Sequence, residues 1–314
     1  MRRRVAWAAL LGGAMGAWLG GAARAEPFEA CAPAPARHAA AAERELSLET
    51  PDGRLEGVLA QPEGAAPRAL AVMLHGYTGA RDEIPVAGGE GMFARAARRL
   101  AERGVATLRI DFLGSGRSDG DWADTRFSGQ ARDARRAAAA LREAFAAAAG
   151  APLGVLGYSQ GGMAALRAGG AFDRVALWAP VLDPMATYGI IFGRETIAAG
   201  AAAAARGETA IVAGTRLRPG FFAELAAADP VADGARVAAP VWVATGRRDP
   251  LIKDGAALAA RLAEARRAEA RRGARRGATT VLDLEAGHDL GALRAPALLD
   301  RVIDCTAGFL LGAD

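Results

Sequence analysis

The sequence predicts an α/β fold with a mostly parallel sheet whose two faces are both covered by helices. The chain has 314 residues and is 52% hydrophobic, which suits one large domain with a substantial core. Six short apolar runs occur along it, and segments with helical character lie between most of them. Apolar strands separated by helices are typical of a parallel sheet that is buried on both faces.

The predicted strands are short runs rich in Val, Leu, Ile and Ala. They cover residues 69–76, 105–112, 152–158, 174–180, 240–246 and 279–287. The intervening predicted helices include residues 91–103, 128–149 and 254–272. The sequence has no apparent internal repeat, so we expect one domain and not a repeat array.

Residues 1–25 are predicted to be a secretory signal peptide. Three arginines at positions 2–4 precede an uncharged stretch, and Ala-Arg-Ala at residues 23–25 offers a small-residue cleavage site. An uncleaved membrane anchor is the alternative, but the stretch is short and rich in Gly and Ala. We expect cleavage, no membrane span in the mature chain, and a periplasmic or secreted protein.

Loss of this segment changes the charge balance of the chain. The whole chain carries 39 Lys and Arg against 35 Asp and Glu, and the segment contains four Arg and no acid. The mature chain is therefore near neutral, and we expect no nucleic-acid partner. In the remaining basic run at residues 261–276, Glu264 and Glu269 alternate with arginines, which favours a solvated helix face over an anion site.

A Pro/Ala-rich lead-in at residues 26–45 is expected before a folded domain at residues 46–314. The lead-in lacks hydrophobic periodicity, so it is expected to lie across the surface. The domain is predicted to open with a β-hairpin, because alternating apolar residues flank a Pro-Asp-Gly turn at residues 51–53.

Residues 183–230 interrupt the alternation of strands and helices and are too numerous for an ordinary connection. We expect a cap insertion with an alanine-rich helix and a short hairpin around residues 210–222. Such an insertion would cover the carboxyl ends of the strands, where open α/β sheets bind ligands.

Ser159 lies where a predicted strand meets a predicted helix. Gly157 and Gly161 flank it in the spacing Gly-x-Ser-x-Gly. Glycines at these positions permit a strained turn that lifts the serine hydroxyl above the end of a sheet. Ser159 is therefore a candidate nucleophile.

A serine nucleophile needs a histidine base, and the base needs an acid to fix its tautomer. The chain has three histidines. His38 lies in the lead-in, and His75 ends a predicted strand, where it is expected to brace a neighbouring loop. His288, on the loop after the last predicted strand, is left as the base.

Asp249 is the preferred acid because it follows a predicted strand at its carboxyl end. The order serine, aspartate, histidine along the chain is also a known order for such groups. Three other aspartates are less suitable: one falls in the insertion, one suits a helix N-cap, and one adjoins the base itself. They are Asp229, Asp254 and Asp289.

A tetrahedral oxyanion needs two preorganised hydrogen-bond donors. One is expected from the backbone N–H of Gln160, the residue after the nucleophile. The second is expected from the loop after Leu-His-Gly at residues 74–76. Tyr77 N–H is the preferred donor there, and Thr78 N–H is the alternative.

Five motifs together resemble those of the α/β-hydrolase superfamily. They are LHGYTGARDE (74–83), IDFLGSGRSDG (110–120), LGYSQGGMA (156–164), GRRDPLI (246–252) and AGHDL (286–290). Within the superfamily, the chain is similar to cinnamoyl/feruloyl esterases and to the serine aminopeptidase-like and monoacylglycerol lipase-like hydrolases. The resemblance covers about residues 46–312 and weakens in the insertion.

This resemblance implies an α/β-hydrolase fold with Ser159 as nucleophile, Asp249 and His288 as its partners, and Tyr77 and Gln160 as oxyanion donors. The expected reaction is hydrolysis of a small-molecule carboxylic ester through an acyl-enzyme, without a cofactor. No cluster of His, Cys and acids in the sequence has metal-ligand spacing.

Substrate preference is expected to depend on the insertion. Phe221 and Phe222 either line an acyl pocket or anchor the insertion, and both alternatives stay open. An aminopeptidase or amidase with the same three residues is a second possible function, and a non-catalytic binding protein of this fold is a third. The insertion carries four arginines against three glutamates, which favours neutral or anionic esters over a free amino terminus. These are Arg194, Arg206, Arg216 and Arg218, and Glu195, Glu208 and Glu224.

Cys31 and Cys305 are the only cysteines. An exported protein meets an oxidising compartment, so we expect them to form a disulfide. Cys305 lies in an apolar-periodic segment near the C-terminus, and the bridge would tie the lead-in to that predicted helix. Two separate buried thiols are the alternative.

Overall fold

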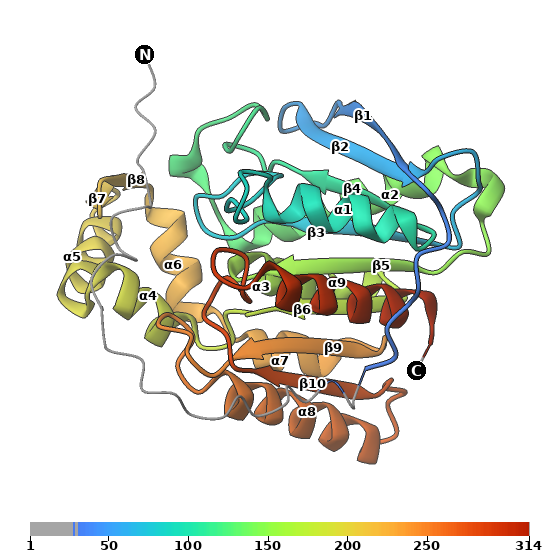
Figure 1. The fold of residues 1–314 in the computed structure, drawn as a ribbon. Helices are drawn as coiled ribbons and strands as arrows, with labels where there is room; N and C mark the ends of the chain where they lie inside the picture. Colours follow the sequence, from blue (N-terminus) through green and yellow to red (C-terminus); the bar gives the residue numbers. More distant parts are fainter. Residues whose placement is uncertain (1–27, 29–30, 314) are drawn as a thin grey trace.

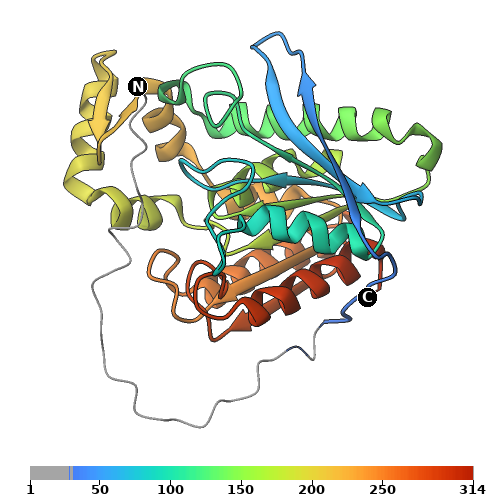
Figure 2. The same ribbon diagram turned by 45° about the horizontal axis from the view of Figure 1, so that its top comes forward.

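The structure is a computed structural model, and it describes Phe28 and residues 31–313. The expected signal peptide, residues 1–25, lies outside the described residues. Among the described residues, no helix combines the length and apolarity that a membrane span requires. Figures 1 and 2 show one twisted sheet with helices on both faces and a group of smaller elements at one end.

The central sheet has eight strands in the order β1-β2-β4-β3-β5-β6-β9-β10. β1 pairs antiparallel with β2, and β2 pairs antiparallel with β4, while the remaining neighbours are parallel. The strands are β1 (Ala41–Leu48), β2 (Leu55–Pro62), β3 (Ala69–Leu74), β4 (Val105–Ile110), β5 (Leu153–Tyr158), β6 (Arg174–Trp178), β9 (Val241–Gly246) and β10 (Thr279–Leu284). The predicted mostly parallel sheet is confirmed, and the predicted hairpin is β1 with β2.

Side chains that alternate along each strand pack into two separate halves of the core, one on each face of the sheet. In β3, Val72 and Leu74 pack into one buried cluster, whereas Ala71 and Met73 pack into the other. Successive side chains of a strand point to opposite faces, so a strand that is apolar throughout supplies both clusters.

Helices cover both clusters. The first lies under α2 (Phe127–Ala144), α3 (Gln160–Ala168) and α8 (Gly255–Arg271), with α7 (Pro230–Arg236) beside α3 and α8. The second lies under α1 (Met92–Glu102) and α9 (Pro296–Leu311). The sheet is therefore covered on both faces, as predicted.

The insertion after β6 is a group of small elements beyond the carboxyl ends of the strands (Figure 1). It comprises α4 (Pro184–Phe192), α5 (Arg194–Ala205), a hairpin of β7 (Ala210–Val212) and β8 (Thr215–Leu217), and α6 (Pro219–Ala227). We call residues 183–230 the cap. The hairpin expected around residues 210–222 is present as β7 and β8. It ends at Leu217, because Pro219 occupies the first turn of α6 and starts that helix.

The lead-in runs across α9 and the end of α1. Ala34 N–H donates to Asp304 O (3.0 Å), and His38 N–H donates to Glu102 O (2.9 Å). β1 begins at Ala41, before the boundary placed at residue 46, because residues 41–48 pair along the whole of β2.

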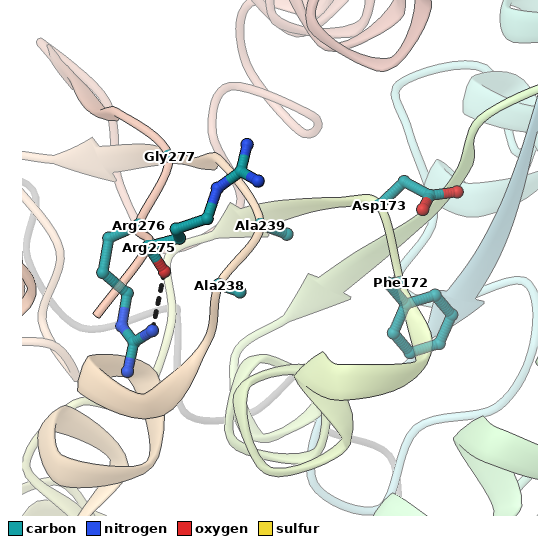
Figure 3. A pocket seen from close by; sticks show the side chains of 7 residues that line it. All are labelled: Phe172, Asp173, Ala238, Ala239, Arg275, Arg276 and Gly277. Carbon is teal, nitrogen blue, oxygen red and sulfur yellow. Dashed lines mark hydrogen bonds between the residues drawn. The ribbon is translucent and has the colours of Figure 1, made fainter. Parts of the chain in front are cut away.

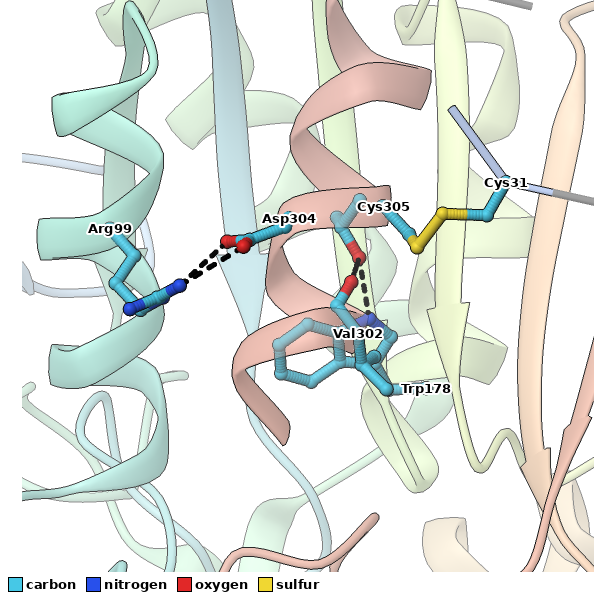
Figure 4. The surroundings of a disulfide bond; sticks show 7 residues. Cys31, Arg99, Trp178, Val302, Asp304 and Cys305 are labelled. Atoms are coloured by element: carbon cyan, nitrogen blue, oxygen red, sulfur yellow. Dashed lines mark hydrogen bonds and ion pairs between the residues drawn. A yellow bond between two sulfur atoms is a disulfide. The ribbon is translucent and has the colours of Figure 1, made fainter. Parts of the chain in front are cut away.

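A disulfide joins Cys31 of the lead-in to Cys305 of α9, as expected from the sequence. Their Cα atoms are 5.5 Å apart, within the range that disulfides permit. Figure 4 shows the bond on one side of α9, where the neighbouring Asp304 accepts hydrogen bonds from Arg99 of α1 at 2.9 and 3.0 Å. The bridge ties the lead-in to a helix that is itself held against the sheet.

Candidate active site

Ser159 occupies the turn between β5 and α3. Its φ is 53° and its ψ is −117°, a conformation that residues other than glycine rarely adopt. The turn is also tightly enclosed, because a Cβ at Gly161 would lie 2.1 Å from Leu74 O and one at Gly157 would lie 2.5 Å from Gly161 O. Both glycines of the motif are therefore required by space, and the chain makes the sharp strand-to-helix turn that the motif predicts.

Ser159, His288 and Asp249 form a chain of hydrogen bonds. Ser159 Oγ lies 3.0 Å from His288 Nε2, and His288 Nδ1 lies 2.7 Å from Asp249 Oδ2. Asp249 follows β9, and His288 follows β10. The carboxyl ends of β5, β9 and β10 thus bring together the three residues selected from the sequence.

The Asp249 carboxylate is held at both of its oxygens. Oδ1 accepts hydrogen bonds from Leu251 N–H and Ile252 N–H, both at 2.8 Å. Oδ2 faces His288, so the Nδ1–H of that ring donates to Asp249 and Nε2 is the acceptor for the Ser159 hydroxyl. In this arrangement the serine proton can move to the imidazole.

The three aspartates that were less suitable than Asp249 as the acid lie elsewhere in local backbone structure. Asp229 caps α7 by accepting from Ala232 N–H (2.9 Å), and Asp289 accepts from the backbone of Leu293 (2.8 Å). Asp254 precedes α8 at the expected N-cap position. Its side chain makes no cap hydrogen bond, however, because its φ of 55° is left-handed instead of extended.

His75 braces the loop that follows β3. Its Nδ1–H donates to Gly76 O (2.9 Å), and its Nε2 accepts from Phe112 N–H (3.1 Å). Burial lowers the pKa of His75 to about 4, so the ring is neutral near pH 7. His75 therefore has the bracing role that its place in the sequence suggests.

Tyr77 and Gln160 flank Ser159 from two different elements. Gln160 is the first residue of α3, where a backbone N–H has no partner within its own helix. The loop of Tyr77 passes beside the nucleophile, because a Cβ at Gly76 would lie 3.3 Å from Ser159 Cβ. Thr78, the alternative donor, has a φ of 53°. The structure thus brings both preferred donors next to Ser159.

Glu83 lies behind the same loop and was not identifiable as a site residue from the sequence. Its carboxyl accepts a short hydrogen bond from Gly76 N–H. Burial raises the pKa of Glu83 to about 7. The sequence shows an acid at the end of the LHGYTGARDE motif, but no residue pattern indicates that its side chain folds back onto the backbone of Gly76.

Phe221 and Phe222 are both buried, but they point to different neighbours. The Phe221 ring lies 6.5 Å from the Tyr77 ring and 5.5 Å from the Tyr188 ring, between the centroids. Phe222 fills the space above Gly200 of α5, where an added Cβ would lie 2.3 Å from its Cε1. Phe222 therefore anchors α6 to α5, whereas Phe221 packs toward the loop that flanks Ser159.

Two surface depressions lie at the other end of the strands from Ser159. The larger, of about 530 Å³, is shown in Figure 3 and is lined by Phe172, Asp173, Ala238, Ala239, Arg275, Arg276 and Gly277. These residues precede β6, β9 and β10, at the amino ends of those strands. Ser159 lies at the carboxyl ends, so this depression is not part of the candidate active site. Within Phe28 and residues 31–313, no group of three or more His, Cys, Asp or Glu side chains could hold a metal ion.

Comparison with known proteins relates part of the chain to a family of hydrolases. Residues 65–207 match the sequence model of a family described as Serine aminopeptidase, S33. A search of curated proteins gives no match.

Several solved structures share the fold at low sequence identity. Est1E from Butyrivibrio proteoclasticus, solved with ferulic acid bound, is 18% identical with a TM-score of 0.61, and the match covers 82% of this chain and 96% of Est1E. Brefeldin A esterase, a bacterial homologue of human hormone-sensitive lipase, is 20% identical with a TM-score of 0.58, over 87% of this chain and 77% of that one. The esterase domain of a Rhodothermus marinus protein is 21% identical with a TM-score of 0.58, over 86% and 98%. The chain has the α/β-hydrolase fold, and the resemblance to the α/β-hydrolase superfamily that its motifs indicate is confirmed.

Proposed function

We propose that the protein is an exported serine hydrolase that cleaves carboxylic esters through an acyl-enzyme. The observation that carries this proposal is the hydrogen-bonded chain from Ser159 through His288 to Asp249, with distances of 3.0 and 2.7 Å. The left-handed backbone of Ser159 adds support, because such strain is kept where it presents a reacting group.

His288 Nε2 takes the proton from Ser159 Oγ as that oxygen attacks the ester carbonyl carbon. The backbone N–H groups of Tyr77 and Gln160 hold the oxyanion of the tetrahedral intermediate. His288 then gives its proton to the departing alcohol, and Ser159 is left acylated. Water attacks the acyl-enzyme with His288 again as base, which releases the acid and restores the serine. Asp249 holds the imidazole in the required tautomer throughout.

Hydrolysis of an amide bond at a free amino terminus is the second candidate function, since part of the chain matches the serine aminopeptidase model. An aminopeptidase needs a carboxylate to bind the substrate ammonium group. In the cap, Glu208 accepts two hydrogen bonds from Arg206 (3.0 and 2.8 Å), and Glu224 accepts from Ser128 N–H (2.8 Å). Two of the three cap glutamates therefore already have partners, which favours the ester over the amine.

Export rests on residues 1–25 and on the disulfide. The Cys31–Cys305 bond is the kind of crosslink that forms in oxidising compartments. A periplasmic or secreted mature chain without its signal peptide is the localisation we propose.

The test is a substrate panel on the mature chain. It comprises p-nitrophenyl esters of increasing acyl length, methyl esters of hydroxycinnamic acids, because Est1E binds ferulic acid, and aminoacyl p-nitroanilides. The proposal expects the highest kcat/KM on an ester. Faster turnover of the anilides would make the protein an aminopeptidase. No turnover of any member, with Ser159 inert to an organophosphorus probe, would make it a non-catalytic member of the fold.

A further inference from the structure

Buried polar side chains link the cap to the residue that follows the nucleophile. The Tyr188 hydroxyl of α4 donates to Gln160 Oε1, and Gln160 Nε2 donates to Gln130 Oε1 of α2 (2.9 Å). Gln130 Nε2 in turn donates to Thr125 Oγ1 (3.3 Å). All four residues are buried, and Gln160 and Tyr188 are only 0% and 1% exposed. Both ends of the Gln160 amide are thereby fixed.

Tyr188 also packs against the other residue that flanks Ser159. Its ring centroid lies 5.7 Å from that of Tyr77, with the two planes nearly perpendicular at 83°. Phe192 of the same helix contacts the Tyr77 ring at 5.4 Å. Tyr188 is thus a cap side chain that touches both residues whose backbone N–H groups are the proposed oxyanion donors: Tyr77 through its ring and Gln160 through its hydroxyl.

We propose that Tyr188 is a positioning residue for the oxyanion hole, so that the cap is part of the catalytic machinery and not only a cover over it. This inference rests on the proposed function and deepens it. A buried amide oxygen is almost always hydrogen-bonded, and the Tyr188 hydroxyl supplies that bond to Gln160. Without it, the Gln160 amide is held only at its Nε2 end, and the first turn of α3, which carries the Gln160 N–H, loses one of its constraints.

The hydroxyl is suited to a constant structural role. Burial raises the pKa of Tyr188 well above its ordinary value, so the hydroxyl stays neutral and can donate at pH values below the ordinary tyrosine pKa of about 10. Among the described residues, Tyr77 is the one titratable group whose charge also raises this pKa. The contribution of Tyr188 should therefore be independent of pH.

The direct test is Tyr188→Phe, which keeps the ring contacts and removes only the hydroxyl. Loss of a complete oxyanion donor costs about 100- to 1,000-fold in kcat, so a misaligned donor should cost on the order of 10-fold. KM for the best ester should stay within about 2-fold, since the loss concerns the transition state. The inhibition constant of a trifluoromethyl ketone, whose adduct with Ser159 carries an oxyanion, should rise by the same factor as kcat falls.

Thr306→Val is the matched control for stability. Thr306 is a buried hydroxyl on α9 that accepts from Trp178 Nε1–H (3.0 Å), far along the chain from the cap. The Thr306→Val variant should lower the Tm by about as much as Tyr188→Phe does, and it should leave kcat within about 2-fold of the parent. An equal fall of kcat in both variants would show a general effect of lost stability and would overturn the inference.

A double variant tests whether Tyr188 acts through Gln160. Gln160→Met keeps the backbone N–H and removes the amide, so adding Tyr188→Phe to it should change kcat no further. The same 10-fold loss in both backgrounds would contradict the inference. Unchanged kcat in Tyr188→Phe, with an active parent, would remove the inference and leave the proposed function intact. An inactive parent that no organophosphorus probe labels would remove both.

Discussion

The turn that carries Ser159 and the cap that lies beside it are built by different means. The turn is fixed by backbone contacts, such as the hydrogen bond from Ser159 N–H to Trp178 O (2.9 Å) and the close passage of Gly161 under Leu74 O. The cap is held by side chains, chiefly aromatic rings and the Tyr188 hydroxyl. Apart from its two glycines, the turn should therefore keep its backbone path when side chains around it change. Side-chain changes in the cap should alter how the cap packs and how it aligns the Gln160 N–H.

The largest effect should come from the acid that orients the base. Asp249→Asn keeps the shape of the side chain but allows the amide NH2 to donate to His288 Nδ1, which leaves the wrong tautomer at Nε2. We expect kcat to fall by up to about 10,000-fold with little change in the Tm. Steady-state kinetics with circular dichroism checks this, and a fall of less than about 10-fold would assign the acid's role to another group.

Removal of the disulfide should lower the stability of the protein without changing its activity. The bridge lies on α9, away from both the turn and the cap, and closes a loop with a sequence separation of 274 residues. The pair Cys31→Ser and Cys305→Ser should lower the free energy of unfolding by about 2 to 5 kcal/mol. Ester turnover measured well below the Tm should stay unchanged. A matching loss of kcat would show that the lead-in reaches the active site.

Substitutions of the two adjacent phenylalanines of the cap should have different effects, one on stability and one on substrate preference. Phe222→Leu weakens the contact between α6 and α5, so it should lower stability by about 1 kcal/mol and reduce kcat/KM equally for all esters. Phe221→Leu changes the packing against Tyr77, so it should shift the ratio of kcat/KM between short and long acyl groups. Identical behaviour of the two variants across the panel would contradict this division.

The turn and its partners were predictable from the sequence because backbone geometry dictates residue type there. Only glycine fits at positions 157 and 161, and Asp249 and His288 follow strands whose carboxyl ends meet at one edge. The contact between Tyr188 and Gln160 was not predictable. It joins residues that are 28 apart in the sequence and lie on separate helices. No periodic pattern in the sequence indicates that two such side chains are in contact. The first strand also starts earlier than expected, because pairing with β2 orders residues 41–45, whose sequence Ala-Ala-Glu-Arg-Glu has no strand pattern of its own.

Two buried titratable groups beside the turn set the stability of the protein toward acid. His75 has a pKa lowered to about 4, so its contribution to stability is lost as the pH falls from about 6.5 to 4. Glu83 has a pKa raised to about 7 from 4.5, so its contribution is present at low pH and lost as the pH rises through that window. The two contributions oppose each other between pH 4.5 and 6.5.

Glu83→Gln should leave His75 as the group that sets the pH dependence of the free energy of unfolding in this window. The amide oxygen can still accept from Gly76 N–H, but the opposing titration is gone. The free energy of unfolding should then fall more steeply toward acid than in the parent, by up to about 1.4 kcal/mol per pH unit. Urea unfolding at pH 4.5, 5.5 and 6.5 measures the two slopes. Equal slopes would mean that Glu83 does not titrate in this window.

The central claim is that Ser159 is a nucleophile activated by His288 and Asp249. The most direct measurement is labelling of the folded mature chain with a fluorophosphonate, followed by peptide mapping, with Ser159→Ala as the control. We predict one adduct, on Ser159, and no adduct and no ester turnover in Ser159→Ala, whose Tm should match that of the parent. An adduct on another residue, or full ester turnover by folded Ser159→Ala, would contradict the claim.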